Sequence, residues 1–213
     1  MRWVLGYLAG FSVLILFVTA GIIFCTFFEP FHRWQHDRLG TSDYMDATMV
    51  LLDYTRGRRD TPAIDEAFFS IPESEHLVEA RQLFAALTTT RNISFFVLLI
   101  ILAIMALCKC PIRFTLARSL REIFAGFMII TLILAGLMIW NFDHVFDMFH
   151  LILFDNDIWS TAERLAVLWP RELFIHAAAF IGALWVLVSA LIITIASVII
   201  RRAKDNAGFG GFL

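Results

Sequence analysis

The sequence predicts an all-α protein with four transmembrane helices and a small helical extracytoplasmic cap. Hydrophobic residues make up 60% of its 213 residues and charged residues only 17%, and 22 residues are Phe. A soluble domain of this length cannot bury so much apolar surface, so the composition alone indicates a membrane protein. Four apolar segments recur along the chain, each close to the roughly 20 residues that a helix needs to cross a bilayer.

The four spans are expected at about residues 3–28, 92–110, 122–141 and 174–200 of a single integral membrane domain. The first and last of them are long and contain no Asp, Glu, Lys or Arg. The two middle spans reach full length when the polar residues at their ends lie at the interface, where long side chains extend toward water. Because no span carries a charged residue in its interior, a transporter or proton channel is disfavoured.

Charged residues predict the orientation of the spans. The segment 109–122 carries four basic residues against one acidic residue, and the tail after residue 200 carries three against one. The positive-inside rule therefore puts both ends of the chain and this segment in the cytoplasm. The two remaining connections, 29–91 and 142–173, would form the extracytoplasmic cap. All six histidines fall on or beside that side, at positions 32, 36, 76, 144, 150 and 176.

The first connection is long and patterned, which predicts two helices. A capping residue at position 41 or 42 can start a helix that runs to about residue 54, and Gly57 closes it. A second helix is expected from about residues 72–74 to residue 89. Its apolar positions share one stripe, and His76 falls at the N-terminal end of that stripe. His76 is therefore expected to face whatever the helix packs on.

The second connection holds a histidine that a carboxylate can orient. If the connection begins as a helix, Asp143, Asp147 and His150 lie at i, i+4 and i+7 on one face. A carboxylate that accepts a hydrogen bond from one ring nitrogen leaves the other nitrogen to act as a base, and histidine titrates near neutral pH. Further along, residues 160–163 form a capping box that predicts a short helix, which Pro170 ends.

Each of these residues also has a purely structural interpretation. A single histidine at an interface is more often a hydrogen-bonded or solvated residue than a catalyst, and Asp143 and Asp147 are compatible with a solvated face. Two histidines from separate segments, His76 and His150, near many aromatic side chains favour catalysis. A non-catalytic assembly or sensing protein with a partner-binding cap is an alternative. A metal-dependent membrane hydrolase that uses both histidines is another, although the sequence has no HExxH pair.

Two groups of residues in the outer connections resemble a known family: the segment 75–84, and a second group made of Phe149, His150, Phe154, Asn156, Trp159 and Pro170. Both resemble the lipoprotein intramolecular transacylases, and the resemblance extends over nearly the whole chain in span number, loop order and length. It implies an enzyme of the bacterial cytoplasmic membrane that moves the sn-2 acyl chain of a lipoprotein's diacylglyceryl-cysteine to the α-amino group of that cysteine. The partners implied are a diacylated lipoprotein and the lipid bilayer, with no cofactor, metal or nucleic acid.

Carried over by position, the resemblance implies that His76 and His150 are the catalytic pair at the junction of cap and membrane. We expect His150 to act as the base and His76 as the acid. No Gly-x-Ser-x-Gly nucleophile occurs, and none is needed when the nucleophile and the acyl donor belong to one molecule. Glu79 keeps a carboxylate one turn from His76, where the family pattern is expected to have an Asp. The supporting residues are Asp147 or Asp143 to orient His150, Asn156 to contact the oxyanion or carbonyl oxygen, and Phe149, Phe154 and Trp159 to bind the substrate.

Overall fold

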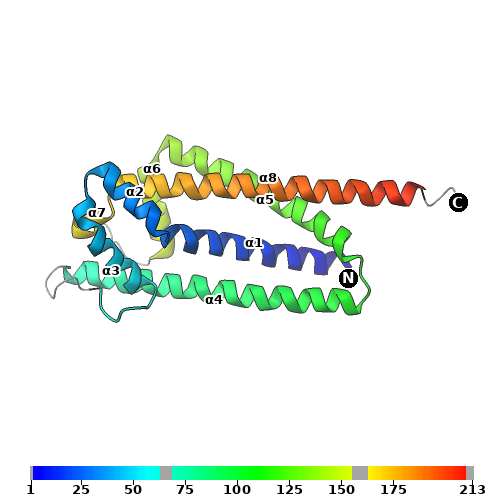
Figure 1. The fold of residues 1–213 in the computed structure, drawn as a ribbon, viewed down its shortest axis with the longest axis horizontal. Helices are drawn as coiled ribbons and strands as arrows, with labels where there is room; N and C mark the ends of the chain where they lie inside the picture. The colour runs from blue at the N-terminus through cyan, green and yellow to red at the C-terminus, as the bar shows by residue number, and fades with distance from the viewer. Residues whose placement is uncertain (1, 63–68, 155–162, 210–213) are drawn as a thin grey trace. The chain divides into compact units, whose positions relative to one another are not determined.

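A computed structural model of the chain describes residues 2–62, 69–154 and 163–209 (Figure 1). Every regular element within these ranges is a helix, which confirms the predicted all-α class. Four of the helices, α1, α4, α5 and α8, are long and apolar enough to cross a membrane, as predicted. In chain order the elements are α1 (Arg2–Thr26), α2 (Glu29–Leu39), the 3-10 helix η1 (Ser42–Tyr44), α3 (Met45–Thr55), α4 (Ile71–Leu107), α5 (Ile112–Trp140), α6 (Phe142–Leu153), α7 (Glu163–Leu168) and α8 (Arg171–Phe209).

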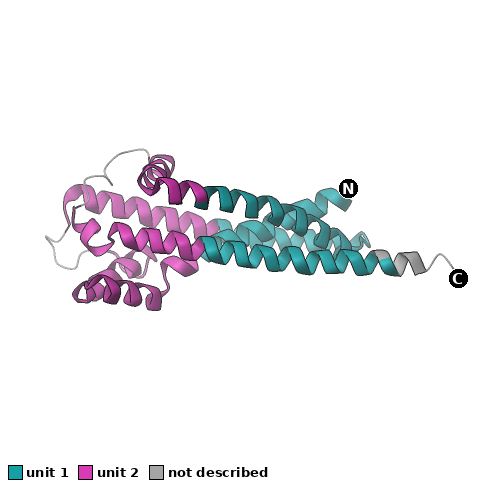
Figure 2. Ribbon diagram, turned by 90° about the horizontal axis from the view of Figure 1, so that it is seen from above, with its two compact units in different colours: residues 1–21, 90–135, 182–213 teal, residues 22–89, 136–181 magenta. Residues whose placement is uncertain are grey.

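The chain forms two compact units, and each of the four long helices contributes residues to both (Figure 2). Unit 1 contains residues 1–21, 90–135 and 182–213, and unit 2 contains residues 22–89 and 136–181. All six histidines of the chain belong to unit 2, whereas the basic segment 109–122 belongs to unit 1. The candidate catalytic residues are therefore confined to unit 2.

Helix α4 differs from the sequence prediction because it does not end near residue 89. It runs without a break for 37 residues, from the segment that bears His76 into the second span. The sequence between residues 85 and 96 contains three threonines and an asparagine but no Gly or Pro, so nothing in it stops a helix. At 1.5 Å per residue the helix is about 55 Å long, which exceeds the roughly 30 Å of the hydrocarbon core. Its polar first half thus has length to extend out of the membrane.

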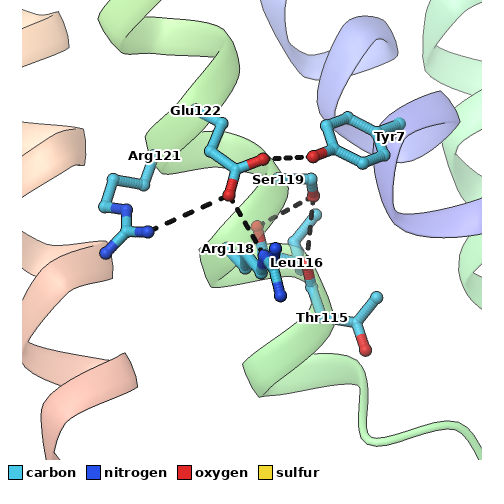
Figure 3. Close-up of polar contacts among 7 residues, drawn as sticks. All are labelled: Tyr7, Thr115, Leu116, Arg118, Ser119, Arg121 and Glu122. Carbon is cyan, nitrogen blue, oxygen red and sulfur yellow. Dashed lines mark hydrogen bonds and ion pairs between the residues drawn. The ribbon is translucent and has the colours of Figure 1, made fainter. Parts of the chain in front are cut away.

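Helix α1 packs closely on α5 within unit 1 through small residues. A Cβ atom added to Gly6 would lie 2.6 Å from Cγ2 of Thr115 and 3.3 Å from its backbone oxygen. Close backbone approach of this kind is a common way for helices to associate in membranes. The Tyr7 hydroxyl of α1 also donates a hydrogen bond to Glu122 of α5, and Arg118 donates a second one to the same carboxylate at 3.1 Å (Figure 3). The one acidic residue of the basic segment is therefore paired.

The core of unit 2 is a small apolar cluster from three helices. It contains Leu51 and Tyr54 of α3, Leu77 of α4, and Leu165 and Leu168 of α7, all of them buried. Helices α3 and α7 lie close to where the sequence predicts them, although α3 begins at Met45 and the expected cap at residue 41 or 42 makes no capping hydrogen bond. The contact of Leu77 places the start of the α4 stripe, beside His76, on the core side.

Helix α2 was not predicted from the sequence, although its signals are there. Pro30 lies in its first turn, where the missing N–H costs nothing, and Gly40 ends it with a φ of 68°. Its buried His36 forms hydrogen bonds through Nδ1 to Thr41 and through Nε2 to Thr48, each at 2.9 Å. This imidazole therefore joins α2 to α3 in a purely structural role.

The close contact between α1 and α5 predicts a sharp difference between two glycine substitutions. Gly6→Ala should lower the free energy of unfolding by about 1–3 kcal/mol, because the new methyl group meets Thr115. Gly126→Ala is the matched control in α5, where an added Cβ meets nothing within 4 Å. It should leave stability unchanged or raise it by up to about 1 kcal/mol through higher helix propensity. Thermal unfolding in detergent checks both, and equal behaviour of the two variants would contradict the described packing.

Candidate active site

Two histidines from separate helices meet in unit 2. The rings of His76, in the second turn of α4, and His150, in the last turn of α6, have centroids 6.1 Å apart. Phe154 packs edge-on against His76 with a centroid distance of 4.7 Å and stacks on His150 at 5.7 Å. The side chain of His76 is 14% exposed and His150 is 7% exposed. The pair thus lies in an aromatic and largely water-excluded setting.

A helix break at Asn141 sets the position of His150. Asn141 has a φ of −153°, outside the helical region, and its side-chain oxygen accepts a hydrogen bond from the backbone N–H of His144 at 3.1 Å. It therefore caps a new helix, α6, instead of letting α5 continue. Phe146, from the same helix, packs on Phe174 of α8 with a centroid distance of 5.1 Å. These contacts fix the rotation of α6 and bury the face that bears His150.

The hydrogen bond of His150 defines its tautomer. Nδ1 lies 2.9 Å from the backbone oxygen of Phe146, and a carbonyl oxygen can only accept, so Nδ1 carries the proton. In the neutral ring, Nε2 is then the atom with the basic lone pair. Burial lowers the pKa of His150 below its usual value of 6.5, against the opposing effects of the Phe146 carbonyl and the charge of Asp147. The ring is therefore neutral at pH 7, as a base must be.

The environment of His76 is different because a carboxylate lies beside it. Nδ1 of His76 is 3.8 Å from Oε2 of Glu79, one turn along α4. This distance is too long for a hydrogen bond. Burial and the nearby His150 lower the pKa of His76 below its usual value of 6.5, and the charge of Glu79 opposes this shift. The two imidazoles thus differ in their partners: a neutral carbonyl for His150 and a carboxylate for His76.

Asp143 pairs with Arg171 and not with His150. Its carboxylate accepts two hydrogen bonds from Arg171 at the start of α8, at 2.5 and 3.1 Å. These bonds hold the pKa of Asp143 below its usual range, so the group is ionised and paired. The carbonyl of Phe146, and not Asp143, is the group that fixes Nδ1 of His150. Asp147 is exposed on α6 and acts on His150 through its charge.

The predicted substrate-binding aromatics have different positions. Phe154 is buried against both histidines, whereas Phe149 is 53% exposed and meets His150 edge-on at 5.4 Å. Asn156 and Trp159 lie outside the described residues, as do the first three residues of the predicted capping box. Helix α7 nevertheless begins at Glu163, the last residue of that box, and ends before Pro170 as expected.

Two groups near the pair escaped the sequence prediction. The carbonyl of Phe146 has no side-chain signal, although a histidine four residues after a helical carbonyl can always reach back to it. Glu73 is buried and accepts hydrogen bonds from the backbone N–H groups of Arg164 and Leu165. The sequence could have indicated a role for Glu73, because Ser70 and Glu73 have the spacing of a capping box and form one at the start of α4.

Other features of the described residues lie apart from the pair. Within these ranges no three His, Cys, Asp or Glu side chains gather closely enough to hold a metal ion, so the metal-dependent hydrolase finds no ligand set there. An apolar pocket of about 390 Å³ lies between α2 and α8 in unit 2, with Phe31, Trp34, His176 and Phe180 among its lining residues. It shares no residue with the histidine pair.

The buried histidines predict the pH dependence of stability. Burial lowers the pKa of four histidines below 6.5: His32, His36, His76 and His150. Between these lowered values and 6.5 the unfolded chain therefore binds more protons than the folded chain. Unfolding is then increasingly favoured as the pH falls from 6.5. Thermal unfolding should occur at lower temperature at pH 5.5 than at pH 7.5. His144→Ala, at an exposed site, should keep that dependence, and a stability that rises on acidification would contradict the described burial.

Comparison with known proteins identifies the family of the chain. The family described as lipoprotein intramolecular transacylase Lit matches residues 3–166. The chain is also similar to the membrane-integral lipoprotein intramolecular transacylase Lit from Bacillus cereus, with a TM-score of 0.80 and 16% identity over 96% of this chain and 98% of that one. Two structures of variants of that protein, with a histidine replaced by arginine or by alanine, match with a TM-score of 0.71 and 16% identity. They cover 97% and 96% of this chain, and 95% and 96% of theirs.

A search of the curated proteins finds no match. The structural similarity is at low identity and shows that the fold is shared. The family match rests on the sequence itself and extends over most of the chain, which confirms the resemblance drawn from the two outer connections. The chain belongs to the lipoprotein intramolecular transacylase (Lit) family of membrane-integral enzymes.

Proposed function

We propose that this enzyme moves the sn-2 acyl chain of a lipoprotein's diacylglyceryl-cysteine to the α-amino group of the same cysteine, with His150 as the base and His76 as the acid. The observation that carries the proposal is the pair of imidazoles, 6.1 Å apart, with different partners in a largely buried setting. General acid and base catalysis needs two such groups near one reacting centre.

The proposed reaction is a rearrangement in which no atom is gained or lost. Nε2 of His150 takes a proton from the cysteine amine as its nitrogen attacks the sn-2 ester carbonyl. The new C–N bond forms, the C–O bond to the glyceryl group breaks, and protonated His76 donates its proton to the departing oxygen. Transfer of one proton from His150 to His76 then restores the pair. The product is an amide on the cysteine and a free hydroxyl on the glyceryl group, and its mass equals that of the substrate.

The different settings of the two histidines favour this division of roles. Burial keeps His150 neutral, and the bond from Nδ1 to Phe146 leaves the lone pair on Nε2. Burial and His150 lower the pKa of His76, and the carboxylate of Glu79 opposes this shift by favouring a proton on that ring. Two charged imidazoles at this separation would repel each other, which disfavours a doubly protonated pair. One neutral and one protonated ring is the state that acid and base catalysis requires.

Orientation of the substrate would supply much of the rate enhancement. The amine and the ester belong to one flexible molecule and must be brought together in a large ring. Holding them in reacting geometry can be worth roughly 7–11 kcal/mol of the barrier. The ring of Phe154 packs on both histidines and keeps water from them, and the exposed Phe149 offers a surface for an acyl chain. Asn156 is proposed to contact the carbonyl oxygen and Trp159 the acyl chains.

We also propose that unit 2 faces away from the cytoplasm of a bacterial cell, with both ends of the chain inside. The support is the excess of basic residues in the segment 109–122 and after residue 200, both of which belong to unit 1. The histidine pair would then meet lipoproteins on the outer side of the cytoplasmic membrane.

Replacement of either histidine should abolish the reaction. His150→Ala and His76→Ala should each lower kcat by about 100-fold or more, the usual contribution of a positioned acid or base. The assay incubates a synthetic diacylglyceryl lipopeptide with purified protein and follows the N-acylated isomer by fragmentation mass spectrometry. His144→Ala removes an exposed histidine from α6 and should retain activity. Full activity in either the His150 or the His76 variant would refute the roles assigned above.

The pH dependence of the reaction should follow both histidines. The base must be neutral and the acid protonated, and burial lowers the pKa of both, so kcat should rise as the pH falls from 8 toward 6.5 and decrease at more acidic pH, once His150 is protonated. Glu79→Gln removes the charge that favours protonated His76 and should lower kcat several-fold. Glu75→Gln, at an exposed position on the same turn of α4, should not. A kcat that only falls as the pH is lowered from 8, or equal effects of the two glutamine variants, would argue against this assignment.

A further inference from the structure

Glu73, in the first turn of α4, is a buried carboxylate that the proposed reaction does not use. It is 2% exposed. Its Oε2 accepts hydrogen bonds from the backbone N–H of Ser70 at 2.9 Å and from the Ser70 hydroxyl at 2.8 Å. Its Oε1 accepts from the backbone N–H groups of Arg164 at 2.7 Å and Leu165 at 3.0 Å. A burial this complete is tolerated because four donors replace the lost water.

The two halves of this interaction join segments that are far apart in the sequence. The bonds to Ser70 form the capping box that begins α4. The bonds to Arg164 and Leu165 satisfy the first turn of α7, and the negative charge lies at the positive end of that helix. Helix α7 has six residues, too few to be stable alone. Glu73 therefore attaches α7 to the start of α4, beside the apolar contact of Leu77 with α7.

His76 lies one turn after Glu73 and shares its surroundings. The next residue, Leu77, packs in one cluster with Leu165 of α7, and Phe154 packs on the His76 ring itself. The second outer connection thus contacts two successive turns of α4, at Glu73 through α7 and at His76 through Phe154. A shift of the first contact would move the turn that bears His76 relative to α6 and His150.

We infer that Glu73 is a positioning residue for the acyl transfer: by binding the first turn of α7 it sets the distance and angle between His76 and His150. This inference rests on the proposed function, because it assigns Glu73 a role in the same reaction. A misplacement of about 1 Å at a reacting centre can cost on the order of 100-fold in rate. Substrate binding depends on other surfaces, so the effect should fall on kcat more than on KM.

Both side-chain oxygens of residue 73 must accept hydrogen bonds, one from Ser70 and the other from the N–H groups of Arg164 and Leu165. An ionised carboxylate offers only acceptors, whereas the amide of Gln presents an NH₂ group to one of the two pairs of donors, whichever way it is turned. Asp keeps two acceptors but is shorter by one methylene. A role as an acceptor therefore predicts that Glu73→Asp is more active than Glu73→Gln. A role that depends only on filling space predicts the reverse, because Gln has the same shape as Glu.

The first part of the test measures kcat, KM and hydrogen exchange of residues 163–168 for the whole enzyme in nanodiscs. Glu73→Gln should lower kcat about 10- to 100-fold, change KM less than about threefold, and speed exchange in α7. Glu73→Asp should recover part of the lost kcat. Glu75→Gln is the matched control, since it removes an exposed carboxylate from the neighbouring position of the same helix and should match the wild type.

The second part removes the donor in place of the acceptor. Arg164→Pro deletes the N–H that Glu73 accepts, within the first turn of α7, where proline is tolerated. Arg164→Ala keeps that N–H and controls for loss of the side chain. Arg164→Pro should lower kcat by about as much as Glu73→Gln, and the double variant should be no worse than the poorer single variant, because both remove one interaction.

The possible results separate this inference from the proposed function. If the wild type converts no lipopeptide, the proposed function fails. If the wild type is active but Glu73→Gln retains its kcat, or is better than Glu73→Asp, the positioning role is overturned. Additive losses in the double variant would overturn it as well, since they would show that Glu73 and the N–H of residue 164 act separately.

Discussion

The proposed chemistry depends on the contact of two imidazoles with one phenylalanine ring. Phe154 packs on both His76 and His150 and keeps them away from water, at a separation where each ring affects the charge of the other. Their remaining contacts differ, because a backbone carbonyl fixes His150 and a carboxylate lies beside His76. The same desolvation that keeps His150 neutral also strengthens the electrostatic interaction of each ring with the charges beside it. A pair of equal and solvated histidines would have no such division of roles.

Unit 2 relies on polar contacts because its apolar core is small. Among the residues that the structure describes, the core cluster of α3, α4 and α7 has five buried members, and α2, α3, α6 and α7 have at most 12 residues each. Buried polar side chains complete the attachment of these helices: His36 joins α2 to α3, and Glu73 joins α4 to α7. Such groups are costly unless they are satisfied, and satisfied groups specify one arrangement of the helices. The distance and angle between His76 and His150 depend on this arrangement of the helices.

Local patterns in the sequence predict much of the fold but not its long-range contacts. Hydropathy predicts the four spans, and capping and glycine signals predict α3 and α7. The apolar stripe of α4 correctly predicts that His76 faces the interior of unit 2. The break at Asn141 is harder to foresee, since asparagine is tolerated inside many helices and becomes a cap only when tertiary packing favours the turn.

The partners of charged residues are even less predictable. Helical spacing puts Asp143 on the same face as His150, but its carboxylate accepts hydrogen bonds from Arg171 of α8. A partner 28 residues away cannot be predicted from a local sequence pattern. The capping box at Glu73 is visible in the sequence, but its bonds to α7 are not. The family itself is suggested by short motifs in the two outer connections, and the family match over residues 3–166 confirms it.

A crossover measurement tests the central claim, intramolecular transfer by this enzyme, most directly. Two lipopeptides are mixed in equal amounts with the wild-type enzyme in nanodiscs: one has a deuterated sn-2 acyl chain on an unlabelled peptide, and the other has an unlabelled chain on a heavy peptide. Transfer within one molecule predicts N-acylated products that keep the original pairing of chain and peptide, with no free fatty acid. Products of mixed labelling, or release of fatty acid, would contradict the account.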